Sequence, residues 1–180
     1  MKCRCLSAYR ISHRCVNFEY IFNMLVHMLE KLNQLLDDVE ALQVKLILLV
    51  GTPGVGKTSL LSAFGKSRGS SVLNIGTELG RRLSAIPQKQ RHLHANSILR
   101  ELADQRVKDG ILLVDNIELL FDRTLQLNPL DLLKRYAHGI RVVAIWPGRV
   151  HNGRLVYAEM GHAEFQDYPV EGFVPFELQQ

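Results

Sequence analysis

The clearest chemistry in the sequence belongs to a glycine-rich run, Gly51-Thr52-Pro53-Gly54-Val55-Gly56-Lys57-Thr58. It fits the phosphate-binding pattern G-x-x-x-x-G-K-S/T at every defined position. Glycines let the backbone curl around an anion so that successive N–H groups point inward, with a helix N-terminus behind them. Lys57 can then reach the β- and γ-phosphates, and the Thr58 hydroxyl is a hard oxygen ligand for Mg²⁺. The expected nucleotide contacts are Thr52, Pro53, Gly54, Val55, Gly56, Lys57, Thr58 and Ser59.

A second motif lies further along the chain. The apolar run Ile111-Leu112-Leu113-Val114 follows the turn pair Asp109-Gly110 and ends in Asp115, which is the form of a Walker B strand. Open α/β sheets bind ligands at the carboxyl ends of their strands. We therefore expect Asp115 to face the Mg²⁺ through a water molecule. The alternative is an ordinary strand-end aspartate in a turn, which the neighbouring phosphate loop makes less favoured.

Strand and helix patterns alternate around these motifs. A proline-capped start, Asn128-Pro129, and a glycine stop, Gly139, bound one of the helices. The alternation predicts a parallel sheet covered by helices. We expect strands at 46–50, 71–75, 111–115 and 142–146, and helices after the phosphate loop and over 78–86, 93–107 and 130–138.

The two ends of the chain differ from this core. From Val16 to Gln43, apolar residues recur at three- and four-residue spacings, which predicts a long amphipathic helix. We favour packing on the sheet as its role, with a partner or self-association seam as the alternative. Residues 155–159 and 164–168 have the pattern of strands that form a terminal hairpin, or of which one joins the edge of the main sheet.

Composition sets the class of protein. The chain has 180 residues, of which 47% are hydrophobic, and this favours a single domain. The net charge of +4 fits an anionic ligand, a nucleic acid or an acidic partner without deciding among them. No apolar stretch approaches the length of a membrane span. The three cysteines, Cys3, Cys5 and Cys15, cluster near the N-terminus in odd number, so we expect a reducing, cytoplasmic location.

We divide the chain accordingly. Residues 1–16 are expected to be a disordered basic tail or an extension upstream of the natural translation start, for which Met24 is a candidate. Residues 17–180 are expected to be one P-loop NTPase domain, made of an N-terminal helix (17–43), a nucleotide-binding core (45–150) and C-terminal strands (151–180).

One intervening strand between the two motifs resembles the additional-strand class of P-loop ATPases, which includes AAA+ and RecA-like proteins. Four further stretches resemble the BrxF family, the small P-loop proteins of BREX type 3 bacterial phage-defence systems. This resemblance covers roughly residues 45–168 and implies a cytosolic ATPase-like component, with ATP and Mg²⁺ as cofactors, that acts with other BREX proteins. The stretches are 73–83, 113–121, 144–148 and 153–159.

The fold class that follows is an α/β P-loop NTPase with a mostly parallel, helix-covered sheet of AAA+-like order. It carries an N-terminal amphipathic helix and a C-terminal β-hairpin, and has no room after the fourth strand for the helical lid of a full AAA+ protein. Additional-strand ATPases usually place a glutamate after the Walker B aspartate, whereas this chain has Asn116. An amide holds a water but cannot accept its proton. Glu118 is the other candidate for orienting water, provided that the chain bends after Asp115.

Other residues leave alternatives open. Trp146 stands where a polar sensor is usual, and packing is favoured over adenine stacking. Arg81-Arg82 and Lys89-Arg91 are either DNA-backbone contacts or solvated helix faces. The candidates for a cationic finger supplied by a second subunit, in a nucleotide-dependent homo-oligomer, are Arg123, Arg135, Arg141 and Arg149.

Two functions fit these patterns. The first is a slow or partner-stimulated ATPase within a DNA-defence assembly. The second is a non-hydrolysing nucleotide-sensing adaptor that organises partner proteins and contacts DNA only indirectly.

Overall fold

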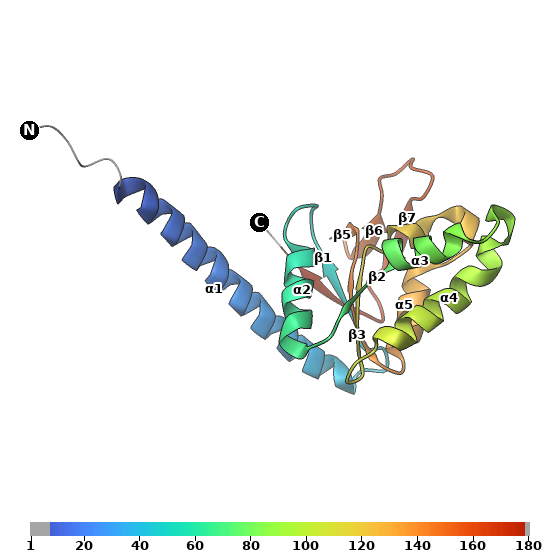
Figure 1. Ribbon diagram of the computed structural model, residues 1–180, viewed down its shortest axis with the longest axis horizontal. Coiled ribbons are helices and arrows are strands. Elements are labelled where there is room, and N and C mark those ends of the chain that lie inside the picture. The colour runs from blue at the N-terminus through green and yellow to red at the C-terminus, as the bar shows by residue number, and fades with distance from the viewer. Residues whose placement is uncertain (1–7, 179–180) are drawn as a thin grey trace, which may run out of the picture.

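The computed structural model describes residues 8–178, with side chains from residue 23 onward. Its helices and strands alternate through the first four strands, and four further strands complete the chain (Figure 1). The helices are α1 (Ala8–Asp38), α2 (Lys57–Arg68), α3 (Ile75–Ser84), α4 (Arg91–Arg106) and α5 (Pro129–Ala137). The short 3-10 helices are η1 (Val39–Ala41), η2 (Gln88–Gln90), η3 (Glu118–Phe121) and η4 (Arg123–Leu125). The strands are β1 (Leu46–Val50), β2 (Val72–Asn74), β3 (Ile111–Asp115), β4 (Arg141–Ile145), β5 (Gly148–His151), β6 (Arg154–Tyr157), β7 (Gln166–Pro169) and β8 (Val174–Glu177).

The main sheet has five strands in the order β2-β3-β4-β1-β8, all of them parallel. β1 pairs with β4 through Leu46↔Val142 and with β8 through Ile47↔Val174. The strand that follows the phosphate loop's helix, β2, lies at one edge and is separated from β1 by two strands. This is the AAA+-like order that the motif positions predicted, and it places the ends of β1 and β3 on the same side of the sheet.

Both faces of this sheet are buried, which explains why its strands are continuous apolar runs instead of alternating ones. Every residue of β1 is inaccessible or nearly so. Successive side chains point to opposite faces. Leu48 therefore joins the core beneath α3, α4 and α5, while Leu49 joins the core beneath α1 and α2.

The helices form two layers around the sheet. Leu36 of α1 and Phe64 of α2 are fully buried on one face, and Leu79 of α3, Leu99 of α4 and Leu133 of α5 are buried on the other. The expected role of the N-terminal helix in packing on the sheet is confirmed for its C-terminal half. The helix begins at Ala8, earlier than residue 17, and its N-terminal part extends away from the body (Figure 1). The prediction for residues 1–7 lies outside the described residues.

The helix cap that the sequence predicted forms at α5, and a second cap, which it did not predict, forms at α3. The Asn128 side chain accepts a hydrogen bond from the Asp131 amide at 3.3 Å, and Pro129 is the first residue of α5. In α3, the Asn74 side chain accepts from the Thr77 amide at 2.9 Å. These side chains satisfy amides that have no partner inside the helix.

The C-terminal region holds more strands than the sequence indicated. The expected hairpin exists as β6 and β7, but β5 pairs with the other side of β6 to give a separate three-stranded antiparallel sheet. We call β5, β6 and β7 the small sheet. The edge position of the main sheet is filled by β8, which the sequence analysis did not identify. Pro175 lies within β8, and an edge strand tolerates proline because one side needs no donor.

Among the described residues, no helix is long and apolar enough to cross a lipid bilayer.

Candidate nucleotide-binding site

The phosphate loop joins β1 to α2 and folds back on its own lysine. Lys57 Nζ donates hydrogen bonds to the carbonyl oxygens of Gly51 at 2.5 Å and Thr52 at 3.0 Å. Gly54 and Gly56 have φ values of +84° and +97°, which L side chains rarely adopt. A Cβ on Gly51 would lie 2.6 Å from the carbonyl oxygen of Leu178, the residue after β8, so this backbone restricts the position to glycine as well.

A cavity of about 560 Å³ opens beside this loop. One wall is the loop with the first turn of α2, the base is the end of β3 and the start of η3, and the opposite wall comes from β5 and the end of β6. The cavity therefore brings together segments that are about a hundred residues apart. Its lining residues are Gly51, Thr52, Pro53, Gly54, Lys57, Thr58, Asp115, Glu118, Ile145, Pro147, Gly148, Arg149, Val156, Tyr157, Ala158 and Glu159.

Most of the expected nucleotide contacts lie on this lining, including Thr52, Pro53, Gly54, Lys57 and Thr58. Three do not. The Val55 side chain packs against the core beneath α1 and α2, Gly56 is the residue before α2, and Ser59 is exposed on the first turn of α2.

Thr58 and Asp115 both line the cavity, so the two expected magnesium ligands converge although one comes from the first turn of α2 and the other from the end of β3. A hydroxyl and a carboxylate are the hard oxygen donors that Mg²⁺ uses, with phosphate oxygens and water completing the octahedron. The described residues hold no group of three or more His, Cys, Asp or Glu that could bind a metal alone. This donor set fits a metal that binds together with a phosphate.

The Lys57 ammonium lies near the carboxylates of Asp115 and Glu118. Burial lowers the pKa of the Lys57 ammonium, while the nearby negative charges of Asp115 and then Glu118 act to raise it. The lysine is half-buried and sits on carbonyl oxygens that cannot neutralise its charge. An anionic ligand at this point would replace lost hydration and stabilise the protonated form.

Asn116, the residue after the Walker B aspartate, turns away from this cavity. Its backbone adopts φ +54°, and its side-chain amide donates to Asn74 Oδ1 at 3.1 Å, at the start of α3. A Cβ on Gly76 would lie only 2.7 Å from Asn116 Nδ2, so the two segments are in close contact. Asn116 thereby joins β3 to α3 and is not part of the cavity lining.

The left-handed turn at Asn116 supplies the bend that Glu118 needed. The chain leaves its extended form there, and η3 begins at Glu118. Glu118 lies on the cavity lining with Lys57 and Asp115. Of the two candidate water-orienting residues, the structure thus places Glu118 beside the phosphate loop and leaves Asn116 outside the cavity lining.

Trp146 belongs to the interior. Its exposed fraction is 0%, and its indole Nε1 donates to the Val156 carbonyl oxygen at 3.1 Å. It meets Phe121 edge to face at 5.3 Å and Tyr168 at 5.8 Å between ring centroids. A buried indole offers no face to an adenine, so the favoured packing role is confirmed. We call Phe121, Trp146, Tyr157 and Tyr168 the aromatic cluster.

The four arginine candidates have different surroundings. Arg149 lines the cavity. Arg141, at the start of β4, pairs with Glu40 at 3.3 Å and donates to the Asp109 carbonyl oxygen, at the opposite end of the strands. Arg135 lines a separate hollow between α4 and α5, and Arg123 lies in η4 outside the cavity lining.

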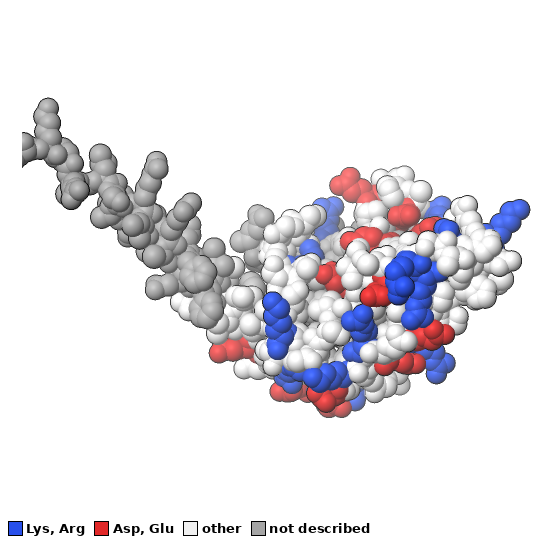
Figure 2. Space-filling model, in the orientation of Figure 1, with Lys and Arg blue, Asp and Glu red and all other residues white. Residues whose placement is uncertain are grey.

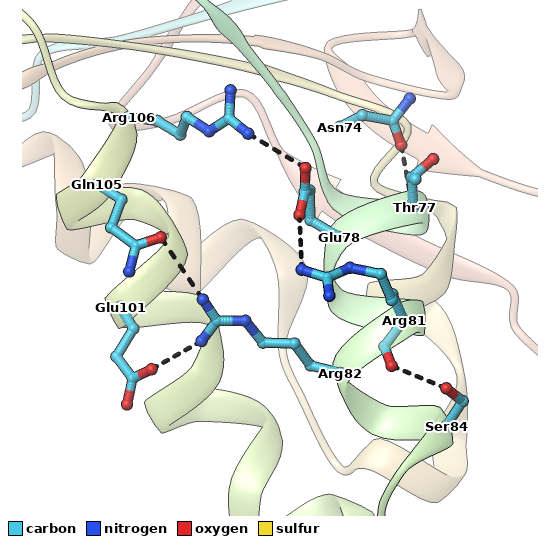
Figure 3. A network of polar contacts seen from close by, with 9 residues as sticks. All are labelled: Asn74, Thr77, Glu78, Arg81, Arg82, Ser84, Glu101, Gln105 and Arg106. Carbon is cyan, nitrogen blue, oxygen red and sulfur yellow. Dashed lines mark hydrogen bonds and ion pairs between the residues drawn. The ribbon is translucent and has the colours of Figure 1, made fainter.

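The basic pair on α3, Arg81-Arg82, contacts acidic neighbours (Figure 3). Arg82 forms an ion pair with Glu101 at 2.7 Å, and Glu78 contacts Arg106 at 3.1 Å and Arg81 at 3.6 Å. These contacts tie α3 to α4. Acidic and basic side chains are interspersed over the face that Figure 2 presents, which favours the solvated-face interpretation over a continuous DNA-binding stripe.

Sequence reasoning missed the wall opposite the loop. Gly148, Tyr157 and Glu159 line the cavity because of a sheet whose pairing the sequence did not reveal, with Glu159 two residues beyond the end of β6. The available signal was Pro147-Gly148, shortly after the fourth strand.

Part of this chain is similar to known proteins. Residues 47–134 match the family model described as "ATPase family associated with various cellular activities (AAA)". A solved structure, PCH-2 of C. elegans, is similar with a TM-score of 0.46 and 16% identity over 87% of this chain. The chain spans 42% of that protein's length. No curated protein sequence matches. The segment 47–134 is thus similar to the nucleotide-binding P-loop segment of AAA ATPases.

Proposed function

We propose that this AAA+-like P-loop chain binds Mg·ATP in the cavity beside the loop and hydrolyses it slowly, with Glu118 orienting the attacking water. The observation that carries the proposal is the convergence of Lys57, Asp115 and Glu118 on one cavity lining. A cation, a magnesium ligand and a carboxylate base are the groups that phosphoryl transfer to water needs.

Each group has a defined part. The loop amides and Lys57 hold the phosphates, and Thr58 and Asp115 would hold the metal. When bound, Mg²⁺ neutralises charge on the phosphate oxygens. The Glu118 carboxylate accepts a hydrogen bond from water and takes its proton, which an amide at neutral pH cannot do. Asn116 acts on the structure by joining β3 to α3.

Slow turnover is expected because Glu118 is exposed and is held by no hydrogen bond among the described residues. A carboxylate that is free to rotate spends little of its time in the productive geometry. A partner protein that fixed η3 would raise the rate.

The wider setting that we propose is a cytoplasmic BREX type 3 phage-defence assembly, in which other BREX proteins are the partners. The resemblance of the stretches at 73–83, 113–121 and 153–159 to BrxF supports this setting. A second candidate function is a non-hydrolysing adaptor. The position of Asn116, which leaves the usual catalytic place without a carboxylate, favours it.

Two measurements on the full chain test the proposal. Calorimetry with Mg·ATP should show binding, and Lys57→Ala should weaken it about 10- to 100-fold, because a hydrogen bond to a charged group is lost. Phosphate release by the wild type then separates the two functions. Turnover that Lys57→Ala removes supports the ATPase, and binding without turnover in the presence of partners and DNA supports the adaptor. Folded protein that binds no purine triphosphate contradicts both.

A further inference from the structure

The wall opposite the phosphate loop carries a cation of its own. We propose that Arg149, at the second position of β5, contacts the terminal phosphate of the nucleotide bound in its own chain, so that the small sheet distinguishes a triphosphate from a diphosphate. This inference rests on the proposed nucleotide site and adds a specificity-determining residue to it.

Close packing determines where Arg149 lies. A Cβ on Gly148 would fall 1.9 Å from the Val156 carbonyl oxygen and 2.9 Å from Trp146 Nε1, so no larger residue fits directly before Arg149. The same Val156 carbonyl oxygen accepts the hydrogen bond of the buried indole. Because Arg149 is paired with Val156 across the strands, its backbone lies beside the carbonyl that holds the buried indole.

The charges of the cavity make Arg149 suited to phosphate. Among the described residues, Arg149 has no hydrogen bond and no ion pair, and it lines the cavity together with Lys57. It also lines the neighbouring hollow formed by Gly51, Thr52 and the end of β8. A guanidinium donates two parallel hydrogen bonds to phosphate oxygens, which a carbonyl or an amide cannot match.

A second arginine on the same sheet provides the contrast. Strand alternation places Arg154 on the same face as Arg149, since His151 lies opposite Arg154. Arg154 Nε contacts Asp167 Oδ1 at 2.6 Å, and its charge is therefore compensated within the sheet. Arg154 does not line the cavity with the phosphate loop. The two residues share a sheet and an exposed position, but only Arg154 has an acidic partner.

The aromatic cluster connects Arg149 to the proposed base. Tyr157, at the end of β6, stacks on Phe121 with ring centroids 3.5 Å apart. Phe121 ends η3, the short helix that begins with Glu118. The segment that carries the carboxylate and the sheet that carries the guanidinium are thus packed as one unit on two sides of one cavity. A terminal phosphate held by Lys57 and Arg149 would therefore lie in the same cavity as the Glu118 carboxylate.

The test compares ATP and ADP affinities by calorimetry with Mg²⁺ on the full chain. Arg149→Ala should weaken ATP binding about 10- to 100-fold, the loss expected for hydrogen bonds to a charged group, and leave ADP binding unchanged. Arg149→Lys should show an intermediate loss, because an ammonium keeps the charge without the fork. The matched control, Arg154→Ala, should leave both affinities unchanged.

Four outcomes would overturn the inference. Equal losses for ATP and ADP would mean that Arg149 is structural, and unchanged affinities would mean that it makes no contact. Recovery of ATP preference after mixing Arg149→Ala with Lys57→Ala protein would place the contact between chains instead of within one. A wild-type chain that binds neither nucleotide would overturn the proposed function as well.

Discussion

The two walls of the nucleotide cavity are built in different ways. The loop wall, from Gly51 to Thr58, is one continuous segment between β1 and α2, and its key contacts join residues five or six apart. The opposite wall is made by the small sheet, and its position depends on Trp146 and on Phe121 from a different segment. Short-range patterns specify the first wall, whereas long-range packing specifies the second.

The difference predicts which substitutions should affect ligand binding and which should affect folding stability. Changes in the loop wall should remove ligand contacts and leave the fold intact, since its lysine is bonded only to loop carbonyls. Changes at the base of the small sheet should cost stability first. If substitutions in the two walls lowered the free energy of unfolding equally, this difference between a local motif and a long-range packing unit would not hold for the cavity.

The largest expected effect is on folding stability. Trp146→Ala removes a fully buried indole and its hydrogen bond to Val156, so the free energy of unfolding should fall by about 3–5 kcal/mol. Lys57→Ala, in the loop wall, should leave the free energy of unfolding nearly unchanged. Urea denaturation followed by circular dichroism measures both free energies. Tryptophan fluorescence would not serve, because Trp146 is the single tryptophan of the chain. A Trp146→Ala loss no larger than that of Lys57→Ala would contradict the comparison.

The same contrast explains what the sequence revealed. The phosphate loop, the β3 strand with Asp115, and the Asn128-Pro129 cap were predicted because each is encoded by neighbouring residues. Each of these local patterns of residues occurs mainly in one local structure. The AAA+-like strand order followed from the positions of the two motifs.

The small sheet and β8 depend on partners far away in sequence. Only four residues form β8, and one of them is Pro175, so its strand conformation comes from pairing with β1. β5 begins at a glycine and alternates half-buried and exposed residues over four positions. Such short segments carry too little pattern to be recognised alone. The bend at Asn116 likewise depends on close packing against Gly76, which is forty residues earlier in the sequence.

The next effect is on turnover. Glu118→Gln keeps the shape of the side chain but removes the proton acceptor, so phosphate release should fall about 100-fold or more while ATP affinity persists. Asn116→Gly, which tolerates the φ of +54°, should retain most of the turnover because the asparagine amide bonds to Asn74 outside the cavity.

Single-turnover phosphate release at saturating ATP measures this pair. The control is Glu101→Gln, the same isosteric change on an exposed carboxylate of α4 that pairs with Arg82 of α3. Turnover that survives Glu118→Gln but is lost in Asn116→Gly would return the water-orienting role to Asn116.

The smallest effect concerns pH and belongs to the loop wall alone. Burial lowers the pKa of Lys57 from its ordinary value of 10.5, and phosphate binding would raise that pKa again. Only the protonated lysine binds phosphate well. ATP affinity should therefore be constant below the lowered pKa and fall as pH rises above it, by at most about tenfold per pH unit. Calorimetry between pH 7 and 10 measures the decline.

Stability should move in the opposite direction over the same window. Between the lowered pKa of the folded protein and 10.5, the unfolded chain binds more protons at Lys57, so this residue makes the free energy of unfolding rise with pH. Lys57→Met removes the titrating group and serves as the reference for both measurements. If ATP affinity and the wild-type-minus-Lys57→Met stability rose or fell together, the phosphate would not be bound to the Lys57 ammonium. An unchanged pH profile in Lys57→Met would assign the titration to another group.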